Sequence, residues 1–362
     1  MEIAAKGNVS ATLKVEGSGN ITYKTAGVDI DAGNESLRRI KNAVKTSHNK
    51  MVMTGLGTFG SLYDLSDVVR NYKEPALVQS VDGVGTKLMI ARMMNRFDTV
   101  GVDLVNHSLN DILCQGARGI TFLDYIAVEK LDPSQVEQLV IGMAGACAEN
   151  GVALVGGETA ELPGIYAKGE YDLAGCITGV VEKSKILTGA EITEGDVIVG
   201  LKSSGLHTNG YTLARKVLLD KMGFSVDTSR PELGCTVGEA LLAPHRDYSK
   251  LVWPLLQKHP VKGIAHITGG GFVDNIPRIL PNSVTAVIKR SAWEIPPLFR
   301  LIQEGGAVPE DDMYRSTNMG IGLVIVIDKN AAPAFVAALS SAGEPPLIIG
   351  HIEKGNGVTK LA

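Results

Sequence analysis

Residues 76–87, Ala-Leu-Val-Gln-Ser-Val-Asp-Gly-Val-Gly-Thr-Lys, carry the pattern from which the fold prediction begins. The apolar run Ala76–Val81 predicts a buried β-strand, which ends abruptly in a turn of glycines, an aspartate and a lysine. Glycine lets a backbone approach an anion closely and point several N–H groups at it. A single turn of this kind indicates a site only weakly, because most glycine turns are only turns.

Predicted strands and helices alternate along the whole chain. The predicted strands are 76–81, 119–128, 152–155, 171–182, 197–201, 263–268, 284–289, 320–327 and 347–352. The predicted helices are one capped by Asn34, 101–115, one that begins at Asp132-Pro133 and ends at Asn150-Gly151, 209–219, 272–280 and 330–341. This alternation predicts an α/β or α+β fold. A polar connection near Leu187 divides it into domains of residues 21–186 and 187–362, after an extension of residues 1–20.

Length and composition limit the classes of protein to which this chain can belong. At roughly 100–200 residues per domain, 362 residues predict two domains. The net charge of −4 argues against non-specific binding to nucleic acid or to an anionic membrane. No apolar run approaches the ~18 residues of a membrane span, and the first residues contain no secretory apolar region. The four cysteines form no CxxC pair, which argues against a zinc or thioredoxin site and predicts a reduced, cytoplasmic chain.

Glycine is in clear excess, with 42 of 362 residues against a usual ~7%. Much of the excess gathers in five clusters beside predicted strands, at 55–60, 82–87, 156–161, 203–210 and 268–272. Five such clusters, several with Ser, Thr, Lys or Asp alongside, predict a phosphate-rich ligand. The cluster 55–60 matches G-x-G-x-x-G, but a dinucleotide site is discounted because only Met51-Val52-Met53 could form the preceding strand.

One face of the helix predicted at 101–115 carries polar side chains. They span about 100° of arc and are Asp103, His107, Asn110, Asp111 and Cys114. Two interpretations stay open: a solvated face, or a face on which one carboxylate and Asn110 hold a hard cation beside phosphates. Asp82 and Glu158 each follow a predicted strand beside glycines, and such scattered carboxylates are typical of a magnesium site.

The histidines and one lysine are harder to interpret. His207 lies in the cluster 203–210, where it is a phosphate or substrate contact, a general acid–base group or a structural residue. Lys41 is interpreted as a surface lysine of the first helix. The histidines outside the polar helix face and the glycine clusters show no ligand spacing: His48, His245, His259, His266 and His351.

Eight segments together resemble the phosphoribosylformylglycinamidine cyclo-ligase (AIR synthetase) family. They are 23–33, 82–88, 105–116, 122–125, 154–164, 203–211, 266–272 and 313–322. The resemblance covers residues 21–355, and the segments are specific as a set although each alone is not. It implies an N-terminal mixed β-sheet domain that pairs with its copy in a homodimer, through a barrel-like interface. It also implies a C-terminal domain with a sheet flanked by helices.

The resemblance implies an enzyme of purine biosynthesis that uses ATP, with Mg²⁺, to close an imidazole ring in formylglycinamidine ribonucleotide. ATP would phosphorylate the amide oxygen, and the ribosyl-bearing amidine nitrogen would then attack that carbon and expel phosphate. An amide oxygen is a poor leaving group and phosphate is a good one. Catalysis would therefore depend mostly on positioning and charge stabilisation.

The resemblance also implies roles for individual residues. The groups near the nucleotide are Lys41, Asp82, Gly83, Gly85, Thr86, Lys87, Gly156 and Gly157. The catalytic candidates are Asn110, Asp111 and His207, and the metal-binding candidates are Asp82, Asp111 and Glu158. The ligand contacts from the second domain, on the substrate side, are Ser204, Gly269, Gly270 and Gly271, together with His207.

Some positions depart from the pattern that the resemblance leads us to expect. They are Thr58 in place of a glycine, His107-Ser108-Leu109 in place of a more apolar stretch, Gly119 in place of proline, and Thr317 in place of an aromatic residue. None of them removes a charged residue of the motifs, so the departures concern fine geometry.

Two alternatives to a cyclo-ligase remain. One is another ATP-using member of the same superfamily, such as a selenophosphate synthetase, a thiamine-monophosphate kinase or a hydrogenase-maturation factor. The first of these would usually carry cysteine or selenocysteine in its early glycine-rich loop, and 55–60 has none. The other alternative is a non-catalytic nucleotide-binding module, against which the presence of Asp82, Asp111 and Glu158 argues.

Overall fold

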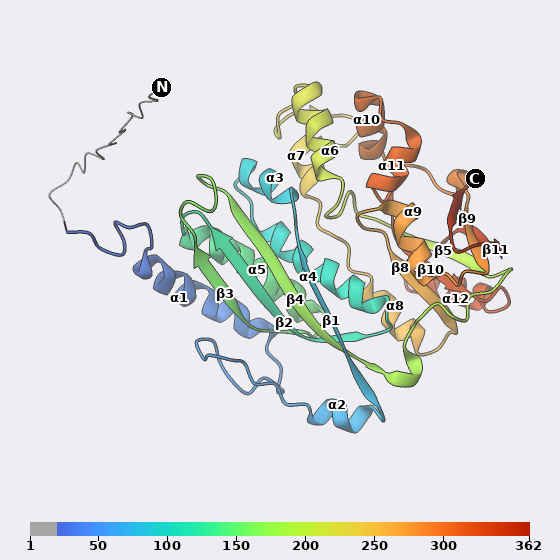
Figure 1. The fold of residues 1–362 in the computed structure, drawn as a ribbon, viewed down its shortest axis with the longest axis horizontal. Helices are drawn as coiled ribbons and strands as arrows, with labels where there is room; N and C mark the ends of the chain where they lie inside the picture. The colour runs from blue at the N-terminus through green and yellow to red at the C-terminus, as the bar shows by residue number, and fades with distance from the viewer. Residues whose placement is uncertain (1–19) are drawn as a thin grey trace, which may run out of the picture.

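The N-terminal half forms a four-stranded sheet with helices packed on one face (Figure 1). The structure, a computed structural model, describes residues 20–362, so nearly all of the predicted extension lies outside the described residues. The elements of this half are α1 (Ile30–Ser47), α2 (Ser66–Asn71), β1 (Pro75–Gly83), α3 (Lys87–Met93), α4 (Asp98–Leu113), β2 (Arg118–Val128), α5 (Pro133–Glu149), β3 (Ala153–Glu161) and β4 (Tyr171–Glu182). The strands run in the order β1-β4-β2-β3, and within this sheet the β2–β3 pair is parallel. The mixed sheet expected here is confirmed.

The two faces of this sheet differ. Helix α4 packs across β1, β4 and β2, while α1 and α5 cover β3. Because side chains alternate along a strand, Phe122 of β2 is buried beneath the helices, whereas Leu123 and Tyr125 expose 41% and 40% of their surface. Leu77 and Val81 of β1 are exposed as well. The face away from the helices is therefore an uncovered apolar surface.

The starts of two helices test the capping predictions. Helix α5 begins at Pro133 with Asp132 as its cap, as predicted. Helix α1 begins at Ile30, so the prediction that Asn34 caps it is wrong. The Asp29 carboxylate caps it instead, because it accepts hydrogen bonds from two backbone N–H groups of the first turn.

Strand β3 runs through the glycine cluster 156–161, where the sequence predicted that the strand stops. That prediction is wrong because the cluster pairs in parallel with β2 as far as Glu161. The Asp124 carboxylate of β2 lies against Gly157, where a Cβ atom would come within 2.3 Å of Asp124 Oδ1. Gly157 therefore allows a close approach within the sheet and does not form a turn.

Helices α4 and α5 cross closely because each has a glycine at the contact. A Cβ atom on Gly101 would lie 2.2 Å from the backbone oxygen of Leu139, and one on Gly142 would lie 2.0 Å from that of Asp98. Both contacts are with backbone, which cannot rotate away. The separation of the two helices therefore depends on these two glycines.

We expect Gly142→Ala to lower the free energy of unfolding by about 1–3 kcal/mol, because the added methyl group overpacks the helix crossing. Gly145→Ala in the same helix is the matched control, since its Cβ atom would meet nothing within 4 Å. Alanine favours a helix over glycine by up to ~1 kcal/mol, so the control should be neutral or stabilised. Urea unfolding of both variants measures the difference, and equal stabilities would contradict the close crossing.

The C-terminal half forms a six-stranded sheet in the order β12-β9-β11-β5-β10-β8, with helices on both faces (Figure 1). Its strands are β5 (Val197–Lys202), β8 (Val261–His266), β9 (Val284–Ile288), β10 (Ile321–Ile327), β11 (Leu347–Lys354) and β12 (Thr359–Leu361), with a separate pair β6 (Ser229–Arg230) and β7 (Cys235–Thr236). Its helices are η1 (Lys183–Lys185), α6 (Tyr211–Arg215), η2 (Lys216–Lys221), α7 (Val237–Leu242), α8 (Ser249–Leu256), α9 (Gly271–Asn275), η3 (Ile276–Ile279), η4 (Arg290–Ala292), α10 (Pro297–Gly306), α11 (Glu310–Ser316) and α12 (Ala332–Ser341). The predicted sheet flanked by helices is confirmed.

Strand β10 is buried on both faces, which explains its continuous apolar run. Ile325 and Ile327 pack in a cluster with Phe335 of α12, while Val324 and Val326 belong to the core on the other face. Two of the predicted helices are interrupted. The helix predicted at 209–219 is α6 followed by the π-helical turn η2, and that at 272–280 is α9 followed by the 3-10 turn η3, which contains proline.

Two observations concern the predictions about membrane spans and cysteines that were made from the composition. Among residues 20–362, no helix combines the length and the apolar character that a membrane crossing requires. All four cysteines are unpaired, and Cys147 is fully buried in the core.

Candidate functional site

Most of the polar face of α4 lies against the C-terminal half: Asp103, His107 and Asn110 are buried, and Asp111 and Cys114 are partly exposed. Asn106 donates to the backbone oxygen of His245 at 2.8 Å, and the backbone N–H of His245 donates to Asp103 at 2.6 Å. One turn further on, Asn110 donates to the backbone oxygen of Arg246 at 2.8 Å and accepts from the N–H of Tyr248 at 2.9 Å. The solvated interpretation is therefore wrong, because this face holds the loop 245–248.

Lys87 is buried at the same junction. Its ammonium lies 2.7 Å from the Asp103 carboxylate and donates to the backbone oxygens of Ala243 at 2.8 Å and His207 at 3.1 Å. Lys87 and Asp103 are both 0% exposed. Burial lowers the pKa of Lys87, and the Asp103 carboxylate opposes that shift. The ammonium has one ion-pair partner, the Asp103 carboxylate, and two hydrogen-bonded backbone oxygens, so in this structure Lys87 joins the two halves and does not reach a ligand pocket.

Asp82 and Asp111 are brought together by His107. His107 Nε2 lies 2.8 Å from Asp82 Oδ2 and 3.3 Å from Asp111 Oδ2. Burial alone would lower the pKa of His107, but the hydrogen bonds to Asp111 and Asp82 raise it to about 10. Burial likewise works against the charge of Asp111, yet the hydrogen bonds from His107 and His266 lower the pKa of this carboxyl. The result is an imidazolium between two carboxylates at the boundary of the halves.

Two histidines without ligand spacing in the sequence complete this cluster. His266 Nδ1 lies 2.8 Å from Asp111 Oδ1, and His266 Nε2 lies 3.0 Å from His245 Nε2. On the other side, His107 Nδ1 lies 2.8 Å from Thr208 Oγ1, which is 3.5 Å from His245 Nδ1. These contacts close a ring of hydrogen bonds that includes Asp111. No local spacing could have revealed it, because its members come from four separate segments.

His207 is buried beside the ring. Its imidazole stacks on that of His245 at 3.9 Å between centroids, and its backbone has a left-handed φ of +63°. Nε2 accepts a hydrogen bond from the Ser204 N–H at 3.2 Å, whereas Nδ1 has no partner among the described residues. Burial lowers the pKa of His207, so the ring is neutral. With Nε2 accepting, the proton is on Nδ1, which makes His207 a hydrogen-bond donor.

A groove of about 830 Å³ lies in the N-terminal half. It is lined by α1, by the glycine cluster 55–60, by the middle of β2 and by most of β3, including Gly156, Gly157 and Glu158. Asp124 also lines it, and burial, helped by the nearby Glu158 charge, raises the pKa of Asp124 to about 7. The cluster 55–60 is thus part of a cavity, although no strand of the sheet precedes it as in a dinucleotide fingerprint.

Glu158 is separated from the other two metal-binding candidates. Asp82 and Asp124 both pair with Gly175 of β4, and Asp124 pairs with Gly157 of β3. Three strand spacings, or about 14 Å, therefore separate the backbone of Asp82 from that of Gly157. Within one chain the structure brings Asp82 and Asp111 together, and it places Glu158 in the groove.

The remaining nucleotide candidates take various positions. Gly83 ends β1, and Gly85 has a left-handed φ of +71° in the turn before α3. The Thr86 hydroxyl lies 3.2 Å from that of Thr212 across the boundary. Lys41 is exposed on α1 and does not line the groove, although its neighbour Ile40 does.

The substrate-side candidates lie in two loops of the C-terminal half. The Ser204 side chain is exposed, and its hydroxyl donates to the backbone oxygen of Pro244 at 2.5 Å. The run Gly269–Gly271 leads into α9, of which Gly271 is the first residue, and Asn275 Nδ2 donates to the backbone oxygens of Gly269 and Gly271. Gly271 has a φ of +57°, and a Cβ atom there would lie 2.0 Å from the Tyr314 backbone oxygen, so only glycine fits. The run is thus held in one shape by packing.

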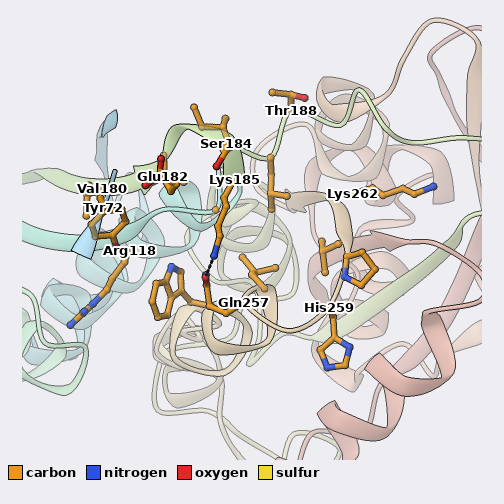
Figure 2. A pocket seen from close by; sticks show the side chains of 18 of the residues that line it. Tyr72, Arg118, Val180, Glu182, Ser184, Lys185, Thr188, Gln257, His259 and Lys262 are labelled. Carbon is orange, nitrogen blue, oxygen red and sulfur yellow. Dashed lines mark hydrogen bonds between the residues drawn. The ribbon is translucent and has the colours of Figure 1, made fainter. Parts of the chain in front are cut away.

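A larger cavity of about 970 Å³ lies elsewhere along the junction of the halves (Figure 2). Figure 2 shows Arg118 and Glu182 on one side and His259 and Lys262 on the other, with Lys185 donating to Gln257 at 2.7 Å. None of the predicted site residues lines it. Volume alone therefore does not identify the functional site.

Comparisons with known proteins define the class. Residues 64–181 match the family model described as AIR synthase related protein, N-terminal domain, and residues 193–360 match the corresponding C-terminal domain. A thiamine-monophosphate kinase from Stenotrophomonas maltophilia K279a has a TM-score of 0.64 at 18% identity, over 90% of this chain and 95% of its own. The hydrogenase maturation protein HypE in complex with ATP has a TM-score of 0.61 at 18% identity, over 90% of each chain. At such low identities, the likeness to these two structures concerns the fold alone. The fold is that of an AIR synthase related protein.

Other relatives are far more similar in sequence. The phosphoribosylformylglycinamidine cyclo-ligase of Alkaliphilus oremlandii is 48% identical over 335 residues, 92% of this chain and 98% of its own. That of Bacillus cytotoxicus is 50% identical over 336 residues, 93% of this chain and 96% of its own. This chain belongs to the phosphoribosylformylglycinamidine cyclo-ligase family. The family and the enzyme class implied by the sequence motifs are confirmed.

Proposed function

We propose that this chain uses ATP to close the imidazole ring of 5-aminoimidazole ribonucleotide from formylglycinamidine ribonucleotide. The observation that carries the proposal is an identity of 48–50% to cyclo-ligases across more than nine-tenths of the chain. ATP phosphorylates the amide oxygen, the ribosyl-bearing amidine nitrogen attacks that carbon, and the C–O bond to phosphate breaks. The complex of HypE with ATP supports nucleotide binding by this fold.

The proposed site spans the groove and the domain boundary. The glycines of 55–60 and 156–157 line the groove, which has the volume that a nucleotide needs. Residues 82–87 lead from the end of β1 to the boundary, where Asn110 orients the loop 245–248 and Asp111 supplies negative charge. The run Gly269–Gly271, with Ser204 and His207, is the proposed substrate side. His207 Nδ1 itself is buried beside Gly322 and has no partner among the described residues.

Asp82, Asp111 and Glu158 are the carboxylates that we propose for divalent cations. Glu158 and its neighbour Asp124 supply only oxygen donors to the groove, which is the donor type that Mg²⁺ prefers. Mg²⁺ bound there would neutralise phosphate charge during transfer. Asp82 and Asp111 also supply oxygens, but two imidazoles lie beside them.

We further propose a homodimer and a cytoplasmic location. Leu77, Val81, Leu123 and Tyr125 expose apolar surface on one face of the N-terminal sheet, and a second copy would cover it. Four unpaired cysteines suit a reducing compartment. Sedimentation of the purified chain tests the dimer, and a monomer at micromolar concentration would contradict it.

We expect purified protein with ATP, Mg²⁺ and formylglycinamidine ribonucleotide to release ADP and phosphate and to form 5-aminoimidazole ribonucleotide. The control omits the ribonucleotide and should release almost no ADP. A second reaction replaces it with thiamine monophosphate, because a kinase of that class shares the fold. The absence of ribonucleotide-dependent ADP, or its appearance only with thiamine monophosphate, would overturn the proposal.

A further inference from the structure

Two imidazoles converge on the carboxylates of Asp82 and Asp111. His107 Nε2 contacts both carboxylates, at 2.8 and 3.3 Å, and His266 Nδ1 lies 2.8 Å from Asp111 Oδ1. One donor atom from each of His107, Asp111 and His266 lies within 4.8 Å of the others. The four side chains come from β1, α4 and β8, and thus from both halves of the chain.

The separations suit ligands of one metal ion. Two atoms bound at about 2.0–2.2 Å in a tetrahedral site lie roughly 3.3–3.6 Å apart. The contact of 3.3 Å lies at the lower end of this range, and the two contacts of 2.8 Å are about 0.5–0.8 Å shorter. An ion could therefore replace the shared protons after small side-chain shifts.

Each imidazole is also held through its other ring nitrogen. His107 Nδ1 lies 2.8 Å from Thr208 Oγ1, and His266 Nε2 lies 3.0 Å from His245 Nε2. Histidines that bind metals usually donate their second ring N–H to a partner that fixes the ring. In this structure His107 Nε2 and His266 Nδ1 share protons with the carboxylates, and release of those protons to solvent on metal binding would leave their lone pairs facing the ion.

The cluster combines rigid imidazoles with accessible carboxylates. His107 and His266 are each 5% exposed, so packing holds their rings in place. The side chains of Asp82 and Asp111 are 49% and 26% exposed, which leaves the carboxylates open to solvent. An ion can therefore reach the cluster from the Asp82 side without unfolding the boundary.

We propose that Asp82, His107, Asp111 and His266 form a mixed imidazole–carboxylate site that binds a first-row transition-metal dication in preference to Mg²⁺. Imidazole suits ions such as Co²⁺ and Zn²⁺, whereas Mg²⁺ prefers carboxylate and water oxygens. The Mg²⁺ that accompanies ATP is then left to the oxygen donors of the groove. The site includes Asp82 and Asp111, to which the proposed function also assigns a cation. Metal binding by this site does not depend on cyclo-ligase turnover.

The test titrates chelator-treated, full-length protein with Zn²⁺, Co²⁺ or Mg²⁺ in a calorimeter, without nucleotide. We expect one equivalent of Zn²⁺ or Co²⁺ to bind at least ~10²-fold more tightly than Mg²⁺. His107→Gln and His266→Gln should each weaken Zn²⁺ binding at least ~10-fold, with little change for Mg²⁺. His351→Gln is the matched control, since this exposed histidine pairs with Glu353 outside the cluster, and it should bind Zn²⁺ as the parent chain does.

Equal affinities of the parent chain for Zn²⁺ and Mg²⁺ would overturn the proposal. Unchanged Zn²⁺ affinity in both histidine variants would overturn it too, because the ion would then bind elsewhere. Thermal unfolding verifies that each variant is folded. If neither histidine variant folds, the preference of the parent chain for Zn²⁺ over Mg²⁺ decides the proposal. Since no nucleotide is present, failure here is distinct from failure of the ADP-release assay.

Discussion

Replacing Asp111 by asparagine is expected to lower turnover at least about 10²-fold while the chain still folds. Asp111 lies 3.3 Å from His107 Nε2 and 2.8 Å from His266 Nδ1, and these hydrogen bonds lower the pKa of its carboxyl, so it is charged at neutral pH. Asparagine keeps the shape but loses the charge, and its NH₂ group would face one of the two donors. Folding should persist because His107 keeps its 2.8 Å contact with Asp82.

Steady-state ADP release at saturating substrates measures this loss, and thermal unfolding verifies the fold. Asp220→Asn is the matched control, because Asp220 is exposed and pairs only with Lys216 on the same helical segment. The control should turn over as the parent chain does. Parent-like turnover in Asp111→Asn would remove Asp111 from the proposed site.

Replacing Lys87 by methionine is expected to destabilise the chain by about 3–5 kcal/mol, since it leaves a buried carboxylate without its partner. Lys87 and Asp103 are 0% exposed and 2.7 Å apart. Loss of the ammonium also leaves the backbone oxygens of Ala243 and His207 without these hydrogen bonds. Methionine has a similar length, so the cost comes mainly from the unpaired polar groups.

The midpoint of guanidinium unfolding measures this cost. Adding Asp103→Asn to Lys87→Met should recover part of it, because a neutral amide still accepts from the His245 N–H. Lys216→Met is the control, since exposed pairs such as Lys216–Asp220 contribute at most about 1 kcal/mol. Equal stability of Lys87→Met and this control would show that the buried ion pair does not hold the two halves together.

Local pattern predicts most of the secondary structure. Strand β4 occupies Tyr171–Glu182, as predicted, because twelve residues of a half-buried strand carry a strong periodic signal. Helix α5 begins at its predicted Asp-Pro pair for a similarly local reason. The predictions fail where a distant segment decides the outcome, as in β3, whose glycines continue as a strand because β2 pairs with them.

The candidate site can be predicted only in part. The glycine clusters and Asp111 stand out in the sequence because their residue types are chemically distinctive. His245 and His266 do not, since a histidine becomes informative only beside a partner, and their partners lie in distant segments. The sequence motifs assign Asn110 and Lys87 to the ligand, whereas in this structure their polar atoms hold loops of the other half.

By itself, the sequence determined the fold class, the two-sheet organisation and the cyclo-ligase family, because hydrophobic periodicity and ordered motifs are written along the chain. The tertiary structure alone decided which polar groups meet. Asp82, His107, Asp111 and His266 converge because α4 lies between the N-terminal sheet and the loops of the second half. Hydrogen bonds and metal sites depend on distances of about 2–3 Å between side chains, and spacing along the chain does not specify such distances.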